Sequence, residues 1–134
     1  MTVEIRRSLA SDTEAARRAR AALSELDGRL PLSVRQDLEL LVSEVVTNAV
    51  RHARVPVDDP IDMTVLVEDD RIRAEIADPG PGFEPTAAAP TIFQAHGWGL
   101  FLVGQLSSRW GVDRASRGTT VWFEIDLAPR RKPA

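Results

Sequence analysis

Two segments of the sequence alternate apolar residues with other residues at every second position, and this alternation constrains the fold more than any other feature. The first segment, 61–78, is interrupted by the turn signal Asp69-Asp70, and the second, 111–127, by Arg117-Gly118. Alternation broken by a short turn predicts a β-hairpin with one apolar face. Two such hairpins need a second layer that covers their apolar faces.

Helices are predicted to form that second layer. Ser11 and Glu14 have the spacing of a capping box, and Gly28 and Pro31 separate the helix that follows from the next one. In chain order, we expect a strand at 2–7, helices at about 11–26 and 33–53, strands at 61–67 and 72–78, a loop at 79–97, a helix at about 98–109, and strands at 111–116 and 119–127. Antiparallel strand pairs covered by three helices on one face predict an α+β fold, a two-layer sandwich.

Length and composition predict one domain and exclude several classes of function. We expect a single domain over 1–134, with its core at about 5–127 and a tail at 128–134. The net charge of -3 gives no electrostatic reason to expect nucleic acid. The absence of Cys and the presence of only 2 His exclude disulfides and a zinc site built from these residues. No apolar stretch is long enough to span a membrane and the N-terminus is polar, so we expect a cytoplasmic protein without membrane contact.

The second predicted helix carries an unexpected row of polar residues. Its segment 39–53, ELLVSEVVTNAVRHA, is apolar on most sides, yet Glu44, Asn48 and His52 recur at a spacing of four and share one stripe. A carboxylate buried between a helix and a sheet is costly without a partner. The row therefore faces either a cavity or, more simply, a solvated edge of the helix.

Three further motifs follow, each of which is weak alone. Asp78 ends a strand on its inward face, where it needs a donor such as an adenine amino group, and the glycines of D-x-G-x-G follow it. Gly97 and Gly99 bracket the start of the third helix, whose free N–H groups would suit phosphate. The segment 118–120, Gly-Thr-Thr, leads into the last strand. Taken singly, each of these motifs is more often only a turn or a helix start.

Taken together and in this order, the motifs are specific. The series E-x-x-x-N-x-x-x-H, D-x-G-x-G, G-x-G-L and G-T-T resembles the GHKL ATPase superfamily, which includes gyrase, Hsp90, histidine kinases and MutL. The segments SEVVTNAVRHA and GWGLFLVGQLSSRWGV…GTTVWFEI are most similar to its anti-sigma-factor serine/threonine kinase branch. The resemblance covers residues from about 5 to 127. It implies the Bergerat fold, with three helices on one face of a mixed, mostly antiparallel sheet.

The resemblance also implies a site for ATP and Mg²⁺. Asn48 would hold Mg²⁺ through its amide oxygen, Glu44 would act as general base near the terminal phosphate, and His52 would line the site. Asp78 would accept a hydrogen bond from the adenine amino group. The remaining implied contacts to the nucleotide involve Gly80 and Gly82 below the base, Gly97, Gly99 and Leu100 at the phosphates, and Thr119 beside Asp78.

Two functions are open on this basis. The first is an ATP-dependent serine/threonine kinase that phosphorylates a small anti-sigma-factor antagonist and sequesters a sigma factor. The second is a nucleotide-gated module that binds its partner with little or no phosphoryl transfer. The second gains weight because residues from Phe83 to Leu102 contain no Lys or Arg, and Trp98 stands where a small or basic residue is frequent.

Two further functions carry less weight, and the assembly of the chain is a separate expectation. A stand-alone histidine-kinase catalytic domain is disfavoured because the chain has no dimerisation helix pair with a phospho-accepting His. A plain α+β domain without nucleotide would require all four ordered motifs to be coincidences. A homodimer is expected from the resemblance, supported by an edge position of the first strand and by exposure of the strand face that carries Thr120 and Trp122.

Overall fold

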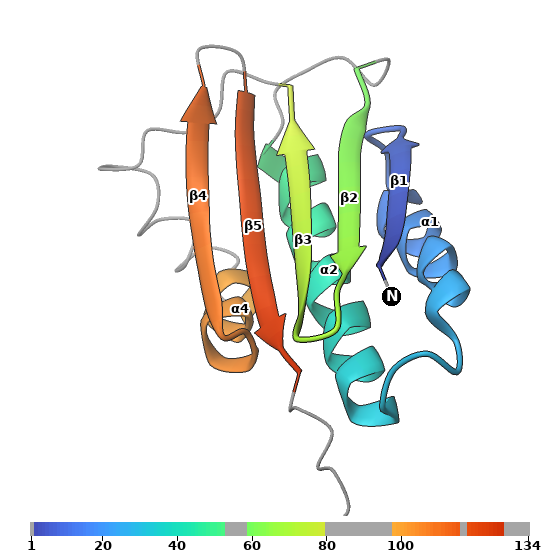
Figure 1. Ribbon diagram of the computed structural model, residues 1–134. Helices are drawn as coiled ribbons and strands as arrows, with labels where there is room; N and C mark the ends of the chain where they lie inside the picture. Colours follow the sequence, from blue (N-terminus) through green and yellow to red (C-terminus); the bar gives the residue numbers. More distant parts are fainter. Residues whose placement is uncertain (1, 53–58, 80–97, 116–117, 128–134) are drawn as a thin grey trace, which may run out of the picture.

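The computed structural model describes residues 2–52, 59–79, 98–115 and 118–127. Its elements, in chain order, are β1 (Val3–Leu9), α1 (Ala15–Ala22), a short 3₁₀ helix η1 (Leu23–Leu26), α2 (Leu32–His52), β2 (Ile61–Val67), β3 (Arg71–Asp78), α4 (Trp98–Leu106), β4 (Arg109–Ala115) and β5 (Gly118–Asp126). The strands form one five-stranded sheet in the order β1-β2-β3-β5-β4, and the helices lie on one of its faces (Figure 1). The predicted α+β two-layer sandwich is therefore confirmed.

All four pairings between neighbouring strands are antiparallel in the described part of the chain. The sheet is thus antiparallel throughout rather than mixed. Between these strands the chain passes through α1 and α2 and reverses direction at each of the three connections, so β2 returns beside β1 in the opposite sense (Figure 1). β1 is an edge strand, as the sequence predicts.

The core lies between α2 and the inner, helix-facing side of the sheet. On β2 and β3 every second residue is buried, as the alternation of the sequence predicts. On α2 the fully buried residues recur at helical spacing. They are Leu38, Leu41, Val42, Val45 and Val46. This face fixes the rotation of α2 on the sheet and so decides which of its side chains stand beside the core.

The predicted capping box is wrong. α1 begins at Ala15 with Glu14 as its N-cap, and no side chain caps its first turn. The backbone N–H of Glu14 donates to Asp12 Oδ1 at 2.9 Å, and the same oxygen accepts from Arg18 at 2.8 Å. The Asp12 carboxylate thus takes the place that the capping box assigns to Ser11, which is buried.

Two other element boundaries differ from the prediction. The first helix gives way to the 3₁₀ turn η1 after Ala22, and α4 ends at Leu106 rather than near 109. Ser107 closes α4, because its N–H donates to the carbonyl of Val103 at 3.0 Å and its hydroxyl contacts the same oxygen. Ser108 N then donates to the Glu124 carbonyl at 2.7 Å, so the chain has already joined the sheet.

Of the two predicted hairpin turns, the structure confirms the first and differs from the prediction at the second. The Glu68 N–H donates to the Arg71 carbonyl at 2.8 Å, which confirms the predicted turn at Asp69-Asp70. At the second hairpin, Ala115 pairs with Gly118. Gly118 is therefore already the first residue of β5 and not part of the turn, and Arg117 lies outside the described residues. Within the described residues, no helix combines the length and apolar character that crossing a membrane requires.

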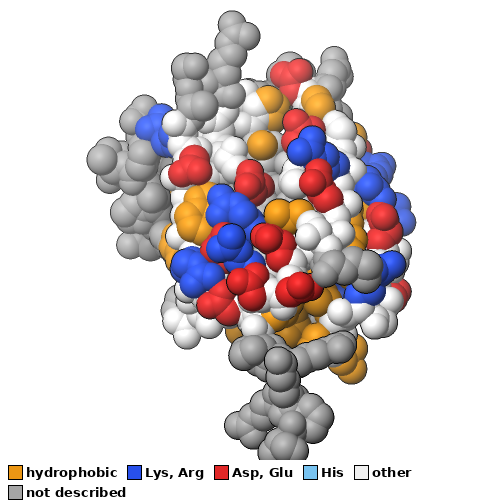
Figure 2. Space-filling view, viewed as in Figure 1, with side chains coloured by type: hydrophobic (Ala, Val, Ile, Leu, Met, Phe, Trp, Pro, Cys, Tyr) orange, Lys and Arg blue, Asp and Glu red, His pale blue; other side chains and the backbone are white. Residues whose placement is uncertain are grey.

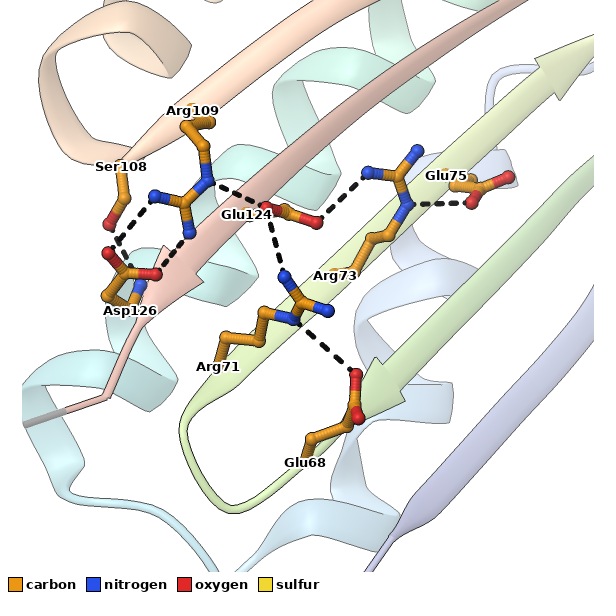
Figure 3. A network of polar contacts seen from close by, with 8 residues as sticks. All are labelled: Glu68, Arg71, Arg73, Glu75, Ser108, Arg109, Glu124 and Asp126. Carbon is orange, nitrogen blue, oxygen red and sulfur yellow. Dashed lines mark hydrogen bonds and ion pairs between the residues drawn. The ribbon is translucent and has the colours of Figure 1, made fainter. Parts of the chain in front are cut away.

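The outer face of the sheet carries a network of charged side chains. Figure 2 shows basic and acidic groups interspersed on this face, and Figure 3 shows the contacts among them. Glu124 of β5 is only 7% exposed and accepts from Arg109 Nε at 2.8 Å and from Arg73 at 3.0 Å. Arg71 lies 3.9 Å away from the same carboxylate. The hydrogen bond from Arg109 lowers the pKa of Glu124 below its ordinary value, with Arg73 and Arg71 acting in the same direction.

Trp122 is part of the same face. The Arg73 guanidinium lies 4.4 Å from the centre of its ring, a cation–π contact. On the neighbouring strand β4, Gly111 stands directly opposite, and a Cβ atom there would lie 2.8 Å from the ring. The indole therefore covers Gly111 and is half-buried by its own chain. The predicted exposure of this Trp is thus only partial.

Candidate functional site

The polar row of α2 lies beside the buried face of the helix. Glu44 and Asn48 are half-buried, and His52 is the last residue of α2, with a side chain outside the described part. The Asn48 side-chain nitrogen is buried and has no hydrogen-bond partner among the described residues. A buried amide with only a packing role is normally hydrogen-bonded. A solvated helix edge therefore does not describe the surroundings of Asn48.

Asp78 and Thr119 form the second part of the site. Asp78 is the last residue of β3, and Thr119 stands directly opposite it on β5. Residues in such a cross-strand pair have Cβ atoms about 4.5–5.5 Å apart and share one face of the sheet. Thr119 is 5% exposed, and its hydroxyl is buried without a hydrogen-bond partner in the described part of the chain. An acceptor and an unsatisfied hydroxyl are thus adjacent at one end of the sheet.

The backbone conformation at position 118, directly before Thr119, requires glycine. Its φ angle is +126°, a conformation that side chains other than hydrogen rarely allow. A Cβ atom at Gly118 would lie 2.4 Å from the backbone oxygen of Asp78. Glycine is therefore what lets β5 start against the end of β3, and this contact aligns Thr119 with Asp78.

Arg114 completes the same row and was missed by sequence reasoning. It stands opposite Thr119 on β4, so Asp78, Thr119 and Arg114 lie side by side across three strands on the inner face. A turn at Arg117-Gly118 would have placed Arg114 opposite Val121 instead. No local sequence signal locates Arg114, because its place depends on β5 beginning at Gly118, whose φ is positive.

The glycine predictions fall largely outside the described residues. Gly80, Gly82 and Gly97 all lie there. Gly99 and Leu100 belong to the first turn of α4, which begins at Trp98 as predicted. The first N–H groups of any helix lack partners within it, so their backbone is suited to an anion.

The packing of α2 and the nature of the nearby side chains determine whether a metal ion fits this site. α2 packs against β2, β3 and α4, so the helix with the polar row neighbours both the strand that ends at Asp78 and the helix that begins at Trp98. Among the described residues there is no cluster of three or more His, Asp or Glu side chains suited to a metal ion. Mg²⁺ fits the residues present only with oxygen ligands from phosphate and water beside the Asn48 amide, a coordination that is common for this ion.

Comparison with known proteins decides the family. Residues 9–125, well over half of the chain, match the family described as histidine kinase-like ATPase domain. The chain belongs to this family. The resemblance to GHKL ATPases is thereby confirmed, and the chain is a nucleotide-binding domain of the histidine kinase-like ATPase type.

Solved structures agree with this assignment. The crystal structure of the RsbU and RsbW domains of Rv1364c from Mycobacterium tuberculosis matches 98% of the chain with a TM-score of 0.73 and 24% identity, and the match covers 35% of that chain. The histidine kinase domain from Erythrobacter litoralis EL346 blue-light activated histidine kinase matches 85% with a TM-score of 0.56 and 25% identity, covering 60% of that chain. This ATPase domain therefore spans less than two thirds of both structures. A comparison with curated protein sequences gives no match.

Proposed function

We propose that the chain binds ATP with Mg²⁺ and acts as a regulatory kinase of the anti-sigma-factor type. It would phosphorylate a serine or threonine of a small antagonist protein and sequester a sigma factor, which places it in the cytoplasm. The observation that carries the proposal is that the Asn48 side-chain nitrogen and the Thr119 hydroxyl are buried without a hydrogen-bond partner among the described residues of an ATPase-type domain. The fold likeness to a structure that contains an RsbW domain supports the branch.

The proposed ATP-binding residues form two groups, one at the adenine base and one at the phosphates. Asp78 accepts from the adenine amino group, and the Thr119 hydroxyl satisfies its hydrogen bond through the same edge of the base. On α2, Asn48 supplies an amide oxygen to Mg²⁺, which neutralises phosphate charge when bound. Glu44 lies one helical turn earlier, where it accepts the proton of the attacking hydroxyl and orients that oxygen toward the terminal phosphate. His52 would line the nucleotide, and Gly97, Gly99 and the start of α4 would meet the phosphates.

Calorimetric titration with ATP, with and without Mg²⁺, tests the binding site. We expect micromolar binding that requires Mg²⁺, and Asp78→Asn should weaken it tenfold or more (about 1.4 kcal/mol). Asp113→Asn is the matched control, because Asp113 carries the same charge at the same end of the sheet but on its exposed outer face. Absence of binding by the folded protein would refute the proposal.

Phosphoryl transfer needs a separate test, because residues from Phe83 to Leu102 include no Lys or Arg. This composition favours the second candidate function, a nucleotide-gated module that binds a partner without transferring phosphate. Incubation with ATP, Mg²⁺ and the cognate antagonist should yield phosphoserine or phosphothreonine if the kinase proposal is right. Glu44→Gln should abolish that product while ATP still binds. Bound nucleotide without any phosphorylated product would establish the module instead.

A homodimer is the further assembly that we propose. The outer face of the sheet is uncovered by any described helix, and β1 is an edge strand with an unpaired side. Trp122 and the charged network around it would lie in or near such an interface. Sedimentation equilibrium of the full chain would give twice the monomer mass if the dimer forms, and the mass of a single chain would refute it.

A further inference from the structure

The row of α2 that contains Glu44 and Asn48 extends toward the start of the helix. Steps of four residues lead from Glu44 back to Leu40, Gln36 and Leu32. Each step turns about 40° around the helix axis, so the row winds slowly from one side of α2 to another. Leu32 is 71% exposed, Leu40 is 40% exposed, Glu44 is half-buried and the Asn48 side-chain nitrogen is buried. The row therefore leads from the surface of the helix into the proposed ATP site.

The exposed part of this row is unusual for the outer face of a helix. Among the described residues, Leu32 and Leu40 are the only large hydrophobic residues that are exposed, and the exposed Gln36 between them is uncharged. Outward helix faces ordinarily carry charged and polar groups. α1 follows this rule, because its exposed Arg17 and Arg18 form ion pairs. Two exposed leucines on one row, beside a residue that the proposed reaction needs, indicate a surface for another molecule.

Two acidic residues border Leu40. Asp37 lies three residues before it and Glu44 four residues after it, so both are its neighbours on the helix surface. Both acidic residues are half-buried. The ion pairs described for α2 involve Arg35, and none of the described ion pairs reaches Asp37 or Glu44. A partner that complements this surface presents an apolar side chain beside a basic one.

We infer that Leu40, with Leu32 and Asp37, forms the docking surface for the protein substrate. The inference rests on the proposed kinase function and adds the residues that select its substrate. The acceptor hydroxyl must come within hydrogen-bond reach of Glu44, so the protein that carries it covers the helix surface next to Glu44. Leu40 lies one turn away on the exposed side of the row. The substrate therefore places an apolar side chain on Leu40 and a Lys or Arg beside Asp37.

A second copy of this chain is the competing occupant of the surface. The proposed homodimer uses the outer face of the sheet, whereas α2 lies on the opposite face (Figure 1). A second copy seated on Leu40 would also lie over the neighbouring Glu44 and would block the acceptor protein. The position of the surface beside Glu44 therefore favours the substrate.

Steady-state phosphorylation of the antagonist protein at saturating ATP and Mg²⁺ tests the docking surface. The variants are Leu40→Gln, Leu32→Gln and Asp37→Asn. Glutamine removes the apolar character and is a good helix former, so it leaves α2 intact. Leu66→Gln is the matched control, because Leu66 lies on the outer face of the sheet, away from the helices. Circular dichroism and calorimetry with ATP check that the fold and the nucleotide site of each variant are unchanged.

Leu40→Gln should raise KM for the antagonist about tenfold (about 1.4 kcal/mol) and leave kcat and the affinity for ATP unchanged, because this side chain contacts only the partner. Leu32→Gln should raise KM by less, and its high exposure keeps the fold unaffected. Asp37→Asn should raise KM and make it less dependent on salt, since it removes the charge that attracts the basic group.

Three results would overturn the inference. The first is a KM of Leu40→Gln and Leu32→Gln equal to that of Leu66→Gln, and the second is a fall in kcat without a rise in KM. The third is a lower mass of Leu40→Gln than of wild type in sedimentation, which would assign the surface to a second copy. In all three, phosphorylation by wild type still upholds the proposed function. If folded wild type binds ATP but yields no phosphorylated antagonist, the kinase proposal itself fails, and the docking surface fails with it.

Discussion

Replacement of Glu124 by Gln should destabilise the protein more than any other change to a single charge on the outer face of the sheet. Glu124 has one short hydrogen bond on each carboxylate oxygen, at 2.8 Å from Arg109 and 3.0 Å from Arg73 (Figure 3). Glutamine keeps one acceptor and presents an NH₂ group to the second arginine, so one contact is lost and the other loses its charge. A hydrogen bond to a charged group contributes about 1.5–3 kcal/mol.

The exposure of the arginines lowers this figure. The side chains of Arg73 and Arg109 are 30% and 48% exposed, and each keeps another acidic partner, Glu75 and Asp126 respectively. Water and these partners stabilise the arginines that Glu124→Gln leaves behind. We therefore expect a loss of about 2 kcal/mol in the free energy of unfolding, well below the 3–5 kcal/mol for breaking a fully buried ion pair.

Thermal and urea unfolding at pH 7 would measure the effect. For a domain of this size, 2 kcal/mol lowers Tm by roughly 8 °C. The matched control is Glu75→Gln, which also removes the negative charge from a hydrogen-bond partner of Arg73, but from a side chain that is 45% exposed. It should lower the stability by less than about 1 kcal/mol. Equal Tm values for the two variants would refute the idea that burial of Glu124 makes its contacts strong.

The pH dependence follows from the same contacts. Hydrogen bonds from Arg109 lower the pKa values of both Glu124 and Asp126 in the folded state. Because these folded-state values lie below the unfolded-state values, the carboxylates contribute their full stability above about pH 4.5 and lose it as the pH falls through the folded-state values. The difference in Tm between wild type and Glu124→Gln should therefore shrink below that pH. A difference that stays constant down to about pH 2, below the ordinary pKa of a carboxyl group, would contradict the assigned partners.

Three further substitutions test the packing. Gly118→Ala should cost more than about 2 kcal/mol, because its φ is +126° and its Cβ would meet the Asp78 carbonyl, and circular dichroism during heating would show it. Gly111→Ala should destabilise by about 1 kcal/mol and change the fluorescence of Trp122, although Ala is ordinarily better than Gly in a strand, because the ring must move. Phe123→Ala should cost about 3–5 kcal/mol in urea unfolding, since Phe123 is fully buried. Unchanged stability in any of the three would contradict the packing described for that residue.

The sequence predicts the order of the elements because each rests on a local pattern. Alternation in 61–67 locates β2, and the helical spacing of apolar residues locates α2. Element ends are less predictable, because several side chains compete for the same backbone groups. At the start of α1 the competition is between Ser11 and Asp12, and the carboxylate takes the N–H of Glu14. At the end of α4 the Ser107 hydroxyl contacts the Val103 carbonyl, which also accepts the Ser107 N–H, and the chain joins the sheet at Ser108.

The site is predictable in part for a related reason. Glu44, Asn48 and Asp78 stand out because a polar residue interrupts an apolar pattern on its own element. Arg114 does not stand out in this way, because an arginine near the end of an edge strand is ordinary. Its place beside Thr119 depends on the register between β4 and β5, and the register depends on the backbone conformation of Gly118. That conformation reflects a contact with Asp78, a residue 40 positions away in the chain.

β5 contributes the central residue to two polar rows, one on each face of the sheet. The difference between the rows indicates that one stabilises the fold and the other binds a ligand. On the outer face Arg73, Glu124 and Arg109 form a row across β3, β5 and β4, and on the inner face Asp78, Thr119 and Arg114 form another across the same strands. In the outer row the central carboxylate has a partner on each oxygen, so the row is complete within the chain. In the inner row the central hydroxyl of Thr119 is buried without a partner among the described residues. The same strand register aligns both rows. The contacts that stabilise the outer row therefore also hold the inner row in position for its ligand.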